Sequence, residues 1–450
     1  MTYFHDLPQQ QKMVKQMMRD VSERILINGE KSLDIVQGII TFVCWYHPHV
    51  FWAQQVTNLL HLAIAMTVEL GIDRAPNQCG EFKQATVKAI HTQAVPRTAT
   101  LEEYRTLAGV FYLTGMLASS FKKMDAMPHT KFLDESMDTL QQAAEYESDL
   151  FVVQMVRLQH LIQETYTTDT TNAPPQLFVR AFKADMDKLR REDPCKDGDN
   201  VFLKLQYLTA EVLIYELSLI DLQDRHANPL RAHIEDLYRC VEAIRSFLDV
   251  YFSIPSSVYL TIPFSTFGQF AHAFIVLVKL ASLEVEGWDM KNLQHKLDFI
   301  SVIDETTARF EASTKSSPDG LTVNNESFGK WAHRMRWMKS IYEAKFSPDV
   351  GDPCTAEVDD SDRGHTTFKA VTLKPPNHPP YPPPQQSAVQ GVQPQSAPPD
   401  DMLSGDFFNY LDEGFWQGFG AEFDLGFDMS MNPVGLATPA QQNIATCHGA

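Results

Sequence analysis

Residues 32–45 are Ser-Leu-Asp-Ile-Val-Gln-Gly-Ile-Ile-Thr-Phe-Val-Cys-Trp, and this stretch decides the fold class that the sequence predicts. Its apolar side chains recur every three to four positions, which is the period of an α-helix rather than of a strand. They cover most of the helix circumference, and a helix that is apolar on nearly all sides is buried. The stretch therefore predicts a central helix, which Pro48 would end. The apolar positions are Leu33, Ile35, Val36, Ile39, Ile40, Val43 and Cys44.

The same helical period recurs in the segments that follow residues 32–45. A helix is predicted from about residue 53, with Gly71 suited to a left-handed cap at its end. Thr100 and Glu103 have the spacing of a capping box at the start of another helix. Alternating strand patterns are scarce, so the sequence predicts an all-α fold. Further helices are predicted at about 148–166, 176–191, 201–221, 229–252, 267–285, 293–312 and 328–345.

Composition excludes several classes of protein. The chain has 450 residues, of which 44% are hydrophobic, so it can bury a sizeable core. Its formal net charge of −19 argues against a body that wraps nucleic acid by its own electrostatics. The most apolar run, Gly38–Tyr46, is about half of the ~20 residues that a membrane span needs, so no membrane is expected. The first residues also lack the pattern of a secretory signal.

The sequence offers little that indicates catalysis or a metal site. No two of the six cysteines lie closer than 35 positions, so zinc and redox motifs are absent and free thiols are expected. His47 and His49 flank a proline and are interpreted as a surface turn rather than a ligand pair. Asp359–Asp362 is interpreted as a solvated acidic loop rather than a magnesium site. We therefore predict no enzyme activity, no catalytic residues, no metal and no cofactor.

The best basic segment is Lys330–Lys339, where Arg334, Arg336 and Lys339 accompany an apolar stripe. A nuclear-import or phosphate-contacting helix would use these charges. The favoured interpretation is an ordinary amphipathic helix that closes the helical bundle, with Trp331, Met335, Met338 and Tyr342 on its apolar side.

Composition changes sharply near residue 347. Lys374–Pro399 contains ten prolines and few apolar anchors, so residues 347–399 are predicted to be a disordered, Pro-rich linker. Residues 351–450 contain thirteen acidic and three basic residues, which makes this part much more acidic per residue than residues 1–350. Residues 1–346 are accordingly predicted as one helical domain, and residues 431–450 as a disordered C-terminus.

Residues 400–430 carry the clearest functional pattern. This acidic-aromatic segment contains eight acidic residues, eight aromatic residues and no basic residue. Five glycines disfavour a free helix, so the segment is predicted to be disordered when free and to order in an apolar groove of a partner. Such composition is typical of transcriptional activation domains. The alternative is that the aromatic side chains fold back onto the helical domain. The predicted coactivator-binding residues are Phe407, Phe408, Leu411, Phe415, Trp416, Phe419, Phe423 and Phe427.

The first 140 residues resemble a known family. The resemblance is carried by Glu30–Gly38 with Trp45–His47, Leu59–Leu60, Glu69–Gly71 with Asp73–Arg74, Arg105–Thr106, Tyr112–Leu113, Lys122–Asp125 and Leu133–Glu135. In order and spacing, these segments resemble the regulatory middle region of fungal binuclear zinc-cluster transcription factors. Lys122 and Lys123 stand where the family usually has paired arginines. The segments are similar to those of members that control secondary-metabolite gene clusters.

The resemblance implies an all-helical regulatory domain between an N-terminal zinc cluster and a C-terminal activation segment. A binuclear cluster needs six closely spaced thiolates and a basic stretch, and this chain has neither. Three explanations are open: a truncated gene model, a natural form without the DNA-binding part, or a subunit that uses the DNA contacts of a partner. The last two predict a homodimer or heterodimer. DNA is then reached indirectly or through a missing N-terminal domain.

These observations predict a nuclear transcriptional regulator, an activator of a secondary-metabolite gene cluster. Its acidic-aromatic segment would recruit coactivators or mediator-type proteins. The alternatives are an all-helical small-molecule sensor or enzyme of the same pathway, and a truncated regulator without DNA binding of its own.

Overall fold

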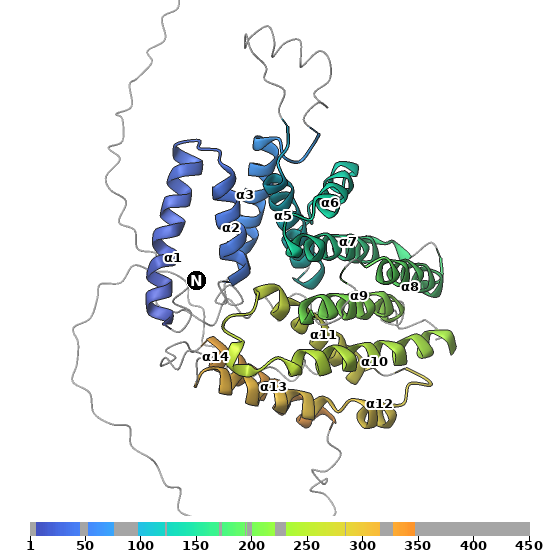
Figure 1. The fold of residues 1–450 in the computed structure, drawn as a ribbon. Coiled ribbons are helices and arrows are strands. Elements are labelled where there is room, and N and C mark those ends of the chain that lie inside the picture. The colour runs from blue at the N-terminus through green and yellow to red at the C-terminus, as the bar shows by residue number, and fades with distance from the viewer. Residues whose placement is uncertain are drawn as a thin grey trace, which may run out of the picture.

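The computed structural model confirms the all-α prediction for the residues that it describes, which contain helices and connecting turns and no β-strand (Figure 1). The structure describes residues 6–45, 53–75, 98–121, 124–170, 173–193, 195, 200–220, 231–283, 285–315 and 327–346. The predicted linker 347–399, segment 400–430 and C-terminus 431–450 lie outside these residues.

The helices follow one another along the whole described chain. Their bounds are α1 Leu7–Ser22, the π-helical turn η1 Glu23–Ile27, α2 Leu33–Trp45, α3 Ala53–Leu70, α5 Leu101–Phe121, α6 Lys131–Ala143, α7 Glu147–Thr167, α8 Pro175–Arg191, α9 Val201–Ile220, α10 Arg231–Ser253, the 3₁₀ turn η5 Ser256–Val258, α11 Phe264–Ala281, α12 Met290–Lys296, α13 Phe299–Ser313 and α14 Ser327–Phe346.

The central helix of the core is α11, in which every residue is buried. It contacts α2 and α5 near the beginning of the chain and α9, α10 and α13 later in the chain. Helix α11 therefore connects early and late helices of the fold. Among the described helices, only α11 has the length and hydropathy to cross a membrane, and its burial within the protein accounts for that composition. The prediction that residues 32–45 form the central helix is therefore wrong. Helix α2 buries one face through Ile35, Val36, Ile39, Phe42 and Val43, while Asp34 and Trp45 are exposed.

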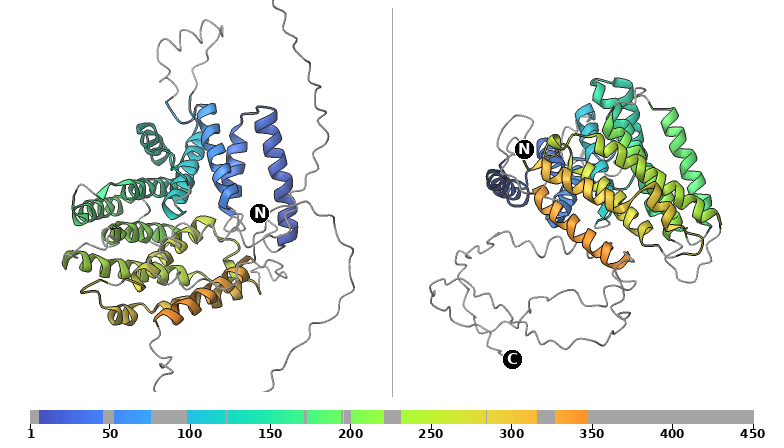
Figure 2. Two further views of the ribbon diagram at one scale, coloured as in Figure 1. Left: turned by 180° about the vertical axis from the view of Figure 1, so that it is seen from behind. Right: turned by 90° about the horizontal axis from the view of Figure 1, so that it is seen from below.

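The helices form two groups that run across one another. In Figure 1, α1, α2 and α3 stand side by side, whereas α7, α9 and α10 run across them, with α13 and α14 beyond α10. Figure 2 shows the same arrangement from behind and from below. Helix α5 belongs to both groups because it contacts α2 and α3 on one side and α6, α7 and α11 on the other.

Two predicted helix ends are confirmed. The Thr100 backbone N–H donates to the Glu103 carboxylate at 2.9 Å, and the Glu103 N–H donates to the Thr100 hydroxyl at 3.2 Å, which completes the capping box of α5. Gly71 follows α3 with φ +66°, and the Ile72 N–H donates to the Thr67 carbonyl at 3.0 Å. This is the left-handed cap that glycine favours.

Apart from the central helix, the structure departs from the prediction in three further places. Helices α1 and α6 lie where the sequence analysis placed none. The helix predicted at 293–312 is two helices, because Leu297 is extended with φ −151° and Asp298 begins α13. The Asp298 carboxylate accepts a hydrogen bond from the Ser301 N–H at 3.0 Å, so this side chain favours a new helix start over continuation of α12.

Candidate functional sites

The predicted coactivator-binding residues lie outside the residues that the structure describes. Their assignment thus stays a prediction, and His47, His49 and Asp359–Asp362 are equally outside the described chain. The eight residues outside the described chain are Phe407, Phe408, Leu411, Phe415, Trp416, Phe419, Phe423 and Phe427.

Polar residues from the segments that carry the family resemblance connect α2, α3 and α5. Lys31, just before α2, forms an ion pair with Glu69 near the end of α3. From α2, the Gln37 amide donates to Glu102 at 3.0 Å and to Thr106 at 3.1 Å, both on α5. These contacts hold the three helices together around their shared apolar core, which gives the segments a structural role.

Arg105 makes the most buried of these contacts. Its guanidinium donates to both carboxylate oxygens of Asp149 on α7, at 2.8 and 2.9 Å, and to Glu145 at 2.6 Å. Asp149 is only 1% exposed, and its carboxylate also accepts from the Tyr146 N–H at the start of α7. The hydrogen bond from Arg105 holds the pKa of Asp149 below its ordinary value. The pair therefore fixes the beginning of α7 against α5.

A buried polar cluster lies between α9 and α11. His272 Nε2 lies 2.9 Å from a carboxylate oxygen of Glu216, and Lys279 Nζ lies 3.5 Å from the other oxygen. A buried glutamine chain also joins α11 and α9 and continues to α7: Gln269 donates to Gln206, which donates to Gln159 at 3.1 Å. These polar contacts orient α11 against α9 and α7, so their evident role is structural.

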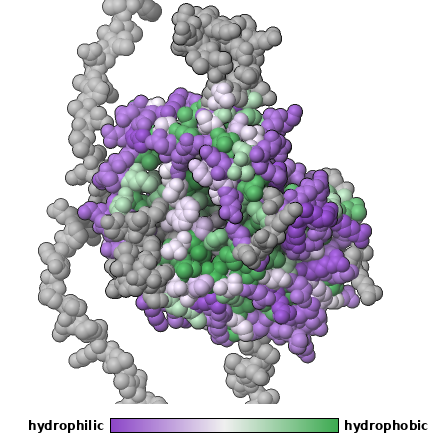
Figure 3. Space-filling view, in the orientation of Figure 1, coloured by the Kyte–Doolittle hydropathy of each residue, from purple (hydrophilic) through white to green (hydrophobic). Residues whose placement is uncertain are grey.

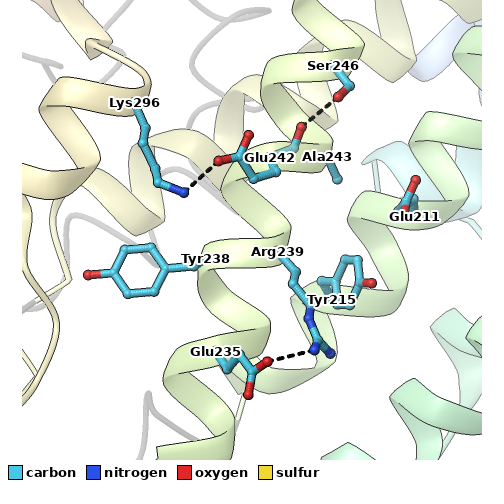
Figure 4. A pocket seen from close by; sticks show the side chains of 9 residues that line it. All are labelled: Glu211, Tyr215, Glu235, Tyr238, Arg239, Glu242, Ala243, Ser246 and Lys296. Atoms are coloured by element: carbon cyan, nitrogen blue, oxygen red, sulfur yellow. Dashed lines mark hydrogen bonds and ion pairs between the residues drawn. The ribbon is translucent and has the colours of Figure 1, made fainter.

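A charged surface pocket of about 380 Å³ lies where α9, α10 and α12 meet (Figure 4). Its cations already have carboxylate partners: Arg239 lies 2.7 Å from Glu235, and Lys296 lies 2.6 Å from Glu242. Because these pairs satisfy the charges within the pocket, it offers little unbalanced charge to a ligand.

A smaller pocket of about 200 Å³ contains two stacked imidazoles. The rings of His129 and His160 lie 3.5 Å apart between centroids, His129 contacts Asp134 at 2.9 Å, and Glu164 lies 3.5 Å from His160. Burial, followed by the nearby His129, lowers the pKa of His160. No group of three or more His, Cys, Asp or Glu side chains suited to a metal ion occurs in the described ranges.

The third pocket, of about 650 Å³, lies where the end of α8 meets the start of α9, and we call it the α8–α9 groove. Its apolar lining comprises Leu203, Tyr207, Leu208 and Val250. Its cations are Arg190, Arg191 and Lys204, and its remaining lining residues are Asp193, Cys195 and Asn200.

The charges of the α8–α9 groove differ from those of the pocket in Figure 4. Within the described part of the chain, the ion pairs made by cations of α8 and α9 are those of Lys183, and none involves Arg190, Arg191 or Lys204. Asp193 is engaged instead by neutral donors, namely the Tyr207 hydroxyl at 3.1 Å and the Cys195 N–H at 2.8 Å. The groove is therefore apolar at its floor, and around that floor lie three cations and one carboxylate, that of Asp193.

The basic helix singled out by the sequence packs as the favoured interpretation predicts. Trp331, Met335 and Met338 of α14 are buried against α13. Lys339 forms an ion pair with Asp304 at 2.7 Å, and Arg336 pairs with Glu311, so carboxylates of α13 balance these cations.

Figure 3 shows hydrophilic side chains around the edge of one molecular face and hydrophobic ones gathered near its middle.

Comparison with known proteins gives a family model and three fungal relatives. A model described as a C-terminal domain matches residues 256–374, which include η5 and α11–α14. Transcription factor opdL of Penicillium oxalicum is 22% identical over 73% of this chain and 61% of its own length. Transcription factor himD of Aspergillus japonicus is 25% identical over 70% of this chain and 54% of its own length.

A transcription factor of Aspergillus terreus is 22% identical over 67% of this chain. The chain spans about half to three fifths of the length of these relatives, from 47% to 61%. No solved structure matches it. The chain is thus similar to part of each of three fungal proteins named transcription factors, and its residues 256–374 match the C-terminal domain model.

Proposed function

We propose that this chain is a nuclear transcriptional regulator that activates transcription by recruiting coactivators through residues 400–430. The observation that carries the proposal is the four-residue spacing of Phe407, Leu411, Phe415, Phe419, Phe423 and Phe427 in a segment without a basic residue. The similarity to proteins named transcription factors supports the same class of function.

The chemistry of the segment fits a docking role. When the segment binds as a helix, a four-residue spacing places each apolar side chain about one turn from the next, so neighbouring members of the row share a face, with Phe408 and Trp416 beside the row. The eight carboxylates keep the aromatic side chains soluble before binding and raise the rate of encounter with a positively charged partner. The expected partners are coactivator or mediator-type proteins with an apolar groove.

The helical body is the part of the chain to which the family resemblance assigns a regulatory role. Its polar contacts, including Arg105–Asp149 and the cluster around Glu216, join helices to one another. On the resemblance of Glu30–Gly38 and Trp45–His47 to the family segments, we extend the proposal to target genes of a secondary-metabolite cluster. Deletion of the gene followed by transcript profiling would test this extension, and unchanged cluster transcripts would contradict it.

The test of activation uses the full chain fused to a foreign DNA-binding domain in a reporter strain. Replacing Phe415, Trp416 and Phe419 together by alanine should abolish reporter output at equal protein level. A control with Val389, Val392 and Leu436 replaced by alanine removes three apolar side chains outside the segment and should leave output unchanged. Equal output from the two triple variants would refute coactivator recruitment by these residues.

A further inference from the structure

The geometry points to the α8–α9 groove as a docking site for the acidic-aromatic segment 400–430 of the same chain. Docking there would withhold the segment from coactivators, so this inference rests on the proposed function and adds a means of regulating it. The groove is made of described side chains from α8, α9 and α10, and the occupant is a defined part of the printed sequence.

Charge complementarity favours this occupant. The groove presents Arg190, Arg191 and Lys204 at its rim, and all three side chains are exposed. The segment carries eight carboxylates and no cation, so three rim cations attract its charges against the repulsion of one lining carboxylate, Asp193. Ion pairs of exposed groups are individually weak, but several together select one surface over another.

The apolar half of the groove complements the aromatic half of the segment. Leu203 and Tyr207 form a buried floor, and Leu208 and Val250 are half-buried beside them. The guanidinium of Arg190 lies 4.9 Å from the centre of the Tyr207 ring, which shows that cation–aromatic contacts already form at this rim. An arriving Phe or Trp ring would find both apolar surface and guanidinium groups.

The volume suits anchor residues rather than the whole segment. A cavity of about 650 Å³ is in the range that holds a drug-sized molecule, which corresponds to a few aromatic side chains. Docking would therefore engage part of the segment, such as the stretch from Phe415 to Phe423, through two or three rings. Such limited contact is compatible with release to a tighter-binding coactivator.

The connection to the helical body is long enough for the segment to reach the groove. Helix α14 ends at Phe346, and the segment begins at Asp400. Even a fully flexible chain of about 50 residues has a root-mean-square span of about 40 Å, and a Pro-rich chain is more extended, whereas a compact body of this size has a radius of gyration of about 20 Å. Because the two parts share one chain, even a weak contact is populated at an effective concentration of about 1 mM.

Cys195 provides a direct readout because it lines the groove and is half-buried. The experiment measures the rate of its alkylation by iodoacetamide in the full chain, by mass spectrometry. One variant combines Glu413→Gln, Glu422→Gln and Asp424→Asn, which removes three charges of the segment without touching the groove. Its matched control, Asp352→Asn with Glu357→Gln and Asp359→Asn, removes three charges outside the segment.

We expect the segment variant to raise the alkylation rate of Cys195 about threefold, as release of a segment docked two thirds of the time would do. The matched control should leave the rate unchanged. The fully buried Cys240 reports unfolding and should react equally slowly in all three proteins. An equal Cys195 rate in all three proteins would overturn the inference, whether the groove is open or filled by another molecule.

Carbodiimide coupling identifies the occupant. It should join the Lys204 amine to carboxylates of residues 400–430, and a mixture of ¹⁵N-labelled and unlabelled chains should give products within one isotope only. Products that combine the two isotopes would show docking between chains and would overturn the inference, as would the absence of any such product at Lys204.

A reporter assay separates this inference from the proposed function. The groove variant, Arg191→Glu with Lys204→Glu, should raise reporter output from the fused full chain about threefold. The control variant, Arg180→Glu with Arg245→Glu, makes an equal charge change at exposed positions of α8 and α10 and should leave reporter output unchanged. Loss of output in the Phe415, Trp416 and Phe419 variant, together with no effect of the groove variant, would refute docking and retain activation. Intact output from that variant would refute activation, while the Cys195 rates would still report docking.

Discussion

Replacing Arg105 by alanine should destabilise the helical body because it removes the cation that balances the buried Asp149. The substitution deletes two hydrogen bonds to Asp149, at 2.8 and 2.9 Å, and one to Glu145 at 2.6 Å. It also removes the guanidinium that lies 4.5 Å from the centre of the Tyr146 ring. Asp149 would keep the hydrogen bond from the Tyr146 N–H at 3.0 Å.

The size of the effect follows from burial. Removing one partner of a fully buried ion pair typically lowers the free energy of unfolding by about 3–5 kcal/mol. The Arg105 side chain is 24% exposed and Asp149 keeps one donor, so we expect a loss of about 2–3 kcal/mol here. Arg157 is the matched control: its side chain is 27% exposed and pairs with Asp138, which is 63% exposed. Arg157→Ala should cost less than about 1 kcal/mol.

The cost of Arg105→Ala should also depend on pH. Arg105 holds the pKa of Asp149 below its ordinary value, so the stability contributed by the pair is present above about pH 4 and is lost as the pH falls through the lowered pKa. In the Arg105→Ala variant, protonation of Asp149 removes its buried, unpaired negative charge and the cost of burying it. The difference in free energy of unfolding between the wild type and the variant should therefore be largest near pH 7 and shrink toward pH 4.

Urea unfolding followed by far-UV circular dichroism measures both effects. Midpoints of the parent chain, Arg105→Ala and Arg157→Ala would be compared at pH 7, 5.5 and 4. An equal loss for the two arginine variants, or a loss for Arg105→Ala that does not change with pH, would refute the structural role assigned to this pair.

Three further substitutions test other parts of the fold by the same unfolding measurement. Phe310→Ala should lower the free energy of unfolding by about 3–5 kcal/mol, because Phe310 is only 2% exposed. Its ring contacts the rings of Tyr259, Phe270, Phe328 and Trp331. A loss below about 1 kcal/mol would contradict the packing of α13 on α11 and α14. Gly71→Ala should lower the free energy of unfolding by about 1–2 kcal/mol, because Gly71 has φ +66°. Gly38→Ala should raise it by about 0.5–1 kcal/mol, because Gly38 lies in a helix and no atom lies within 4 Å of the added Cβ. A change of the same sign in the free energy of unfolding of both variants would refute the left-handed cap at Gly71. Asp298→Ala should cost about 1 kcal/mol by removing the cap of α13, and no change would show that another group begins this helix.

The helical fold was predictable because its signals are local. The capping pair Thr100 and Glu103 and the left-handed Gly71 are each fixed by residues within one or two turns, and both are confirmed. The break at Asp298 was also encoded locally. It was missed because the apolar period continues across Leu297, and period alone does not distinguish one helix from two in line.

The identity of the central helix was not predictable in this way. Residues 33–45 and 264–281 are both apolar, and only the tertiary arrangement decides which one is enclosed. Helix α11 contains polar residues that would argue for exposure, including Gln269, His272 and Lys279. The structure buries them against Glu216 and Gln206, residues more than 50 positions earlier in the sequence. Partners at such a separation leave no local pattern.

The α8–α9 groove was missed for a related reason, although its cations were visible. Lys188–Arg191 is too short a basic segment to be specific, and Lys204 lies on another helix. The end of α8 and the start of α9 bring these charges around Leu203 and Tyr207, so the site depends on the connection between two helices. A sequence pattern confined to one helix does not contain that information.

The overall charge explains why docking of residues 400–430 would be selective and reversible. The chain carries a net charge of −19, and its acidic residues outside the segment repel it from most of the body. At physiological ionic strength this repulsion acts over about 8 Å, so the segment meets attraction only where cations without carboxylate partners gather around apolar surface. The α8–α9 groove combines both features in the described chain. Since exposed ion pairs provide much of the attraction, a partner with a deeper apolar groove would displace the segment at little cost.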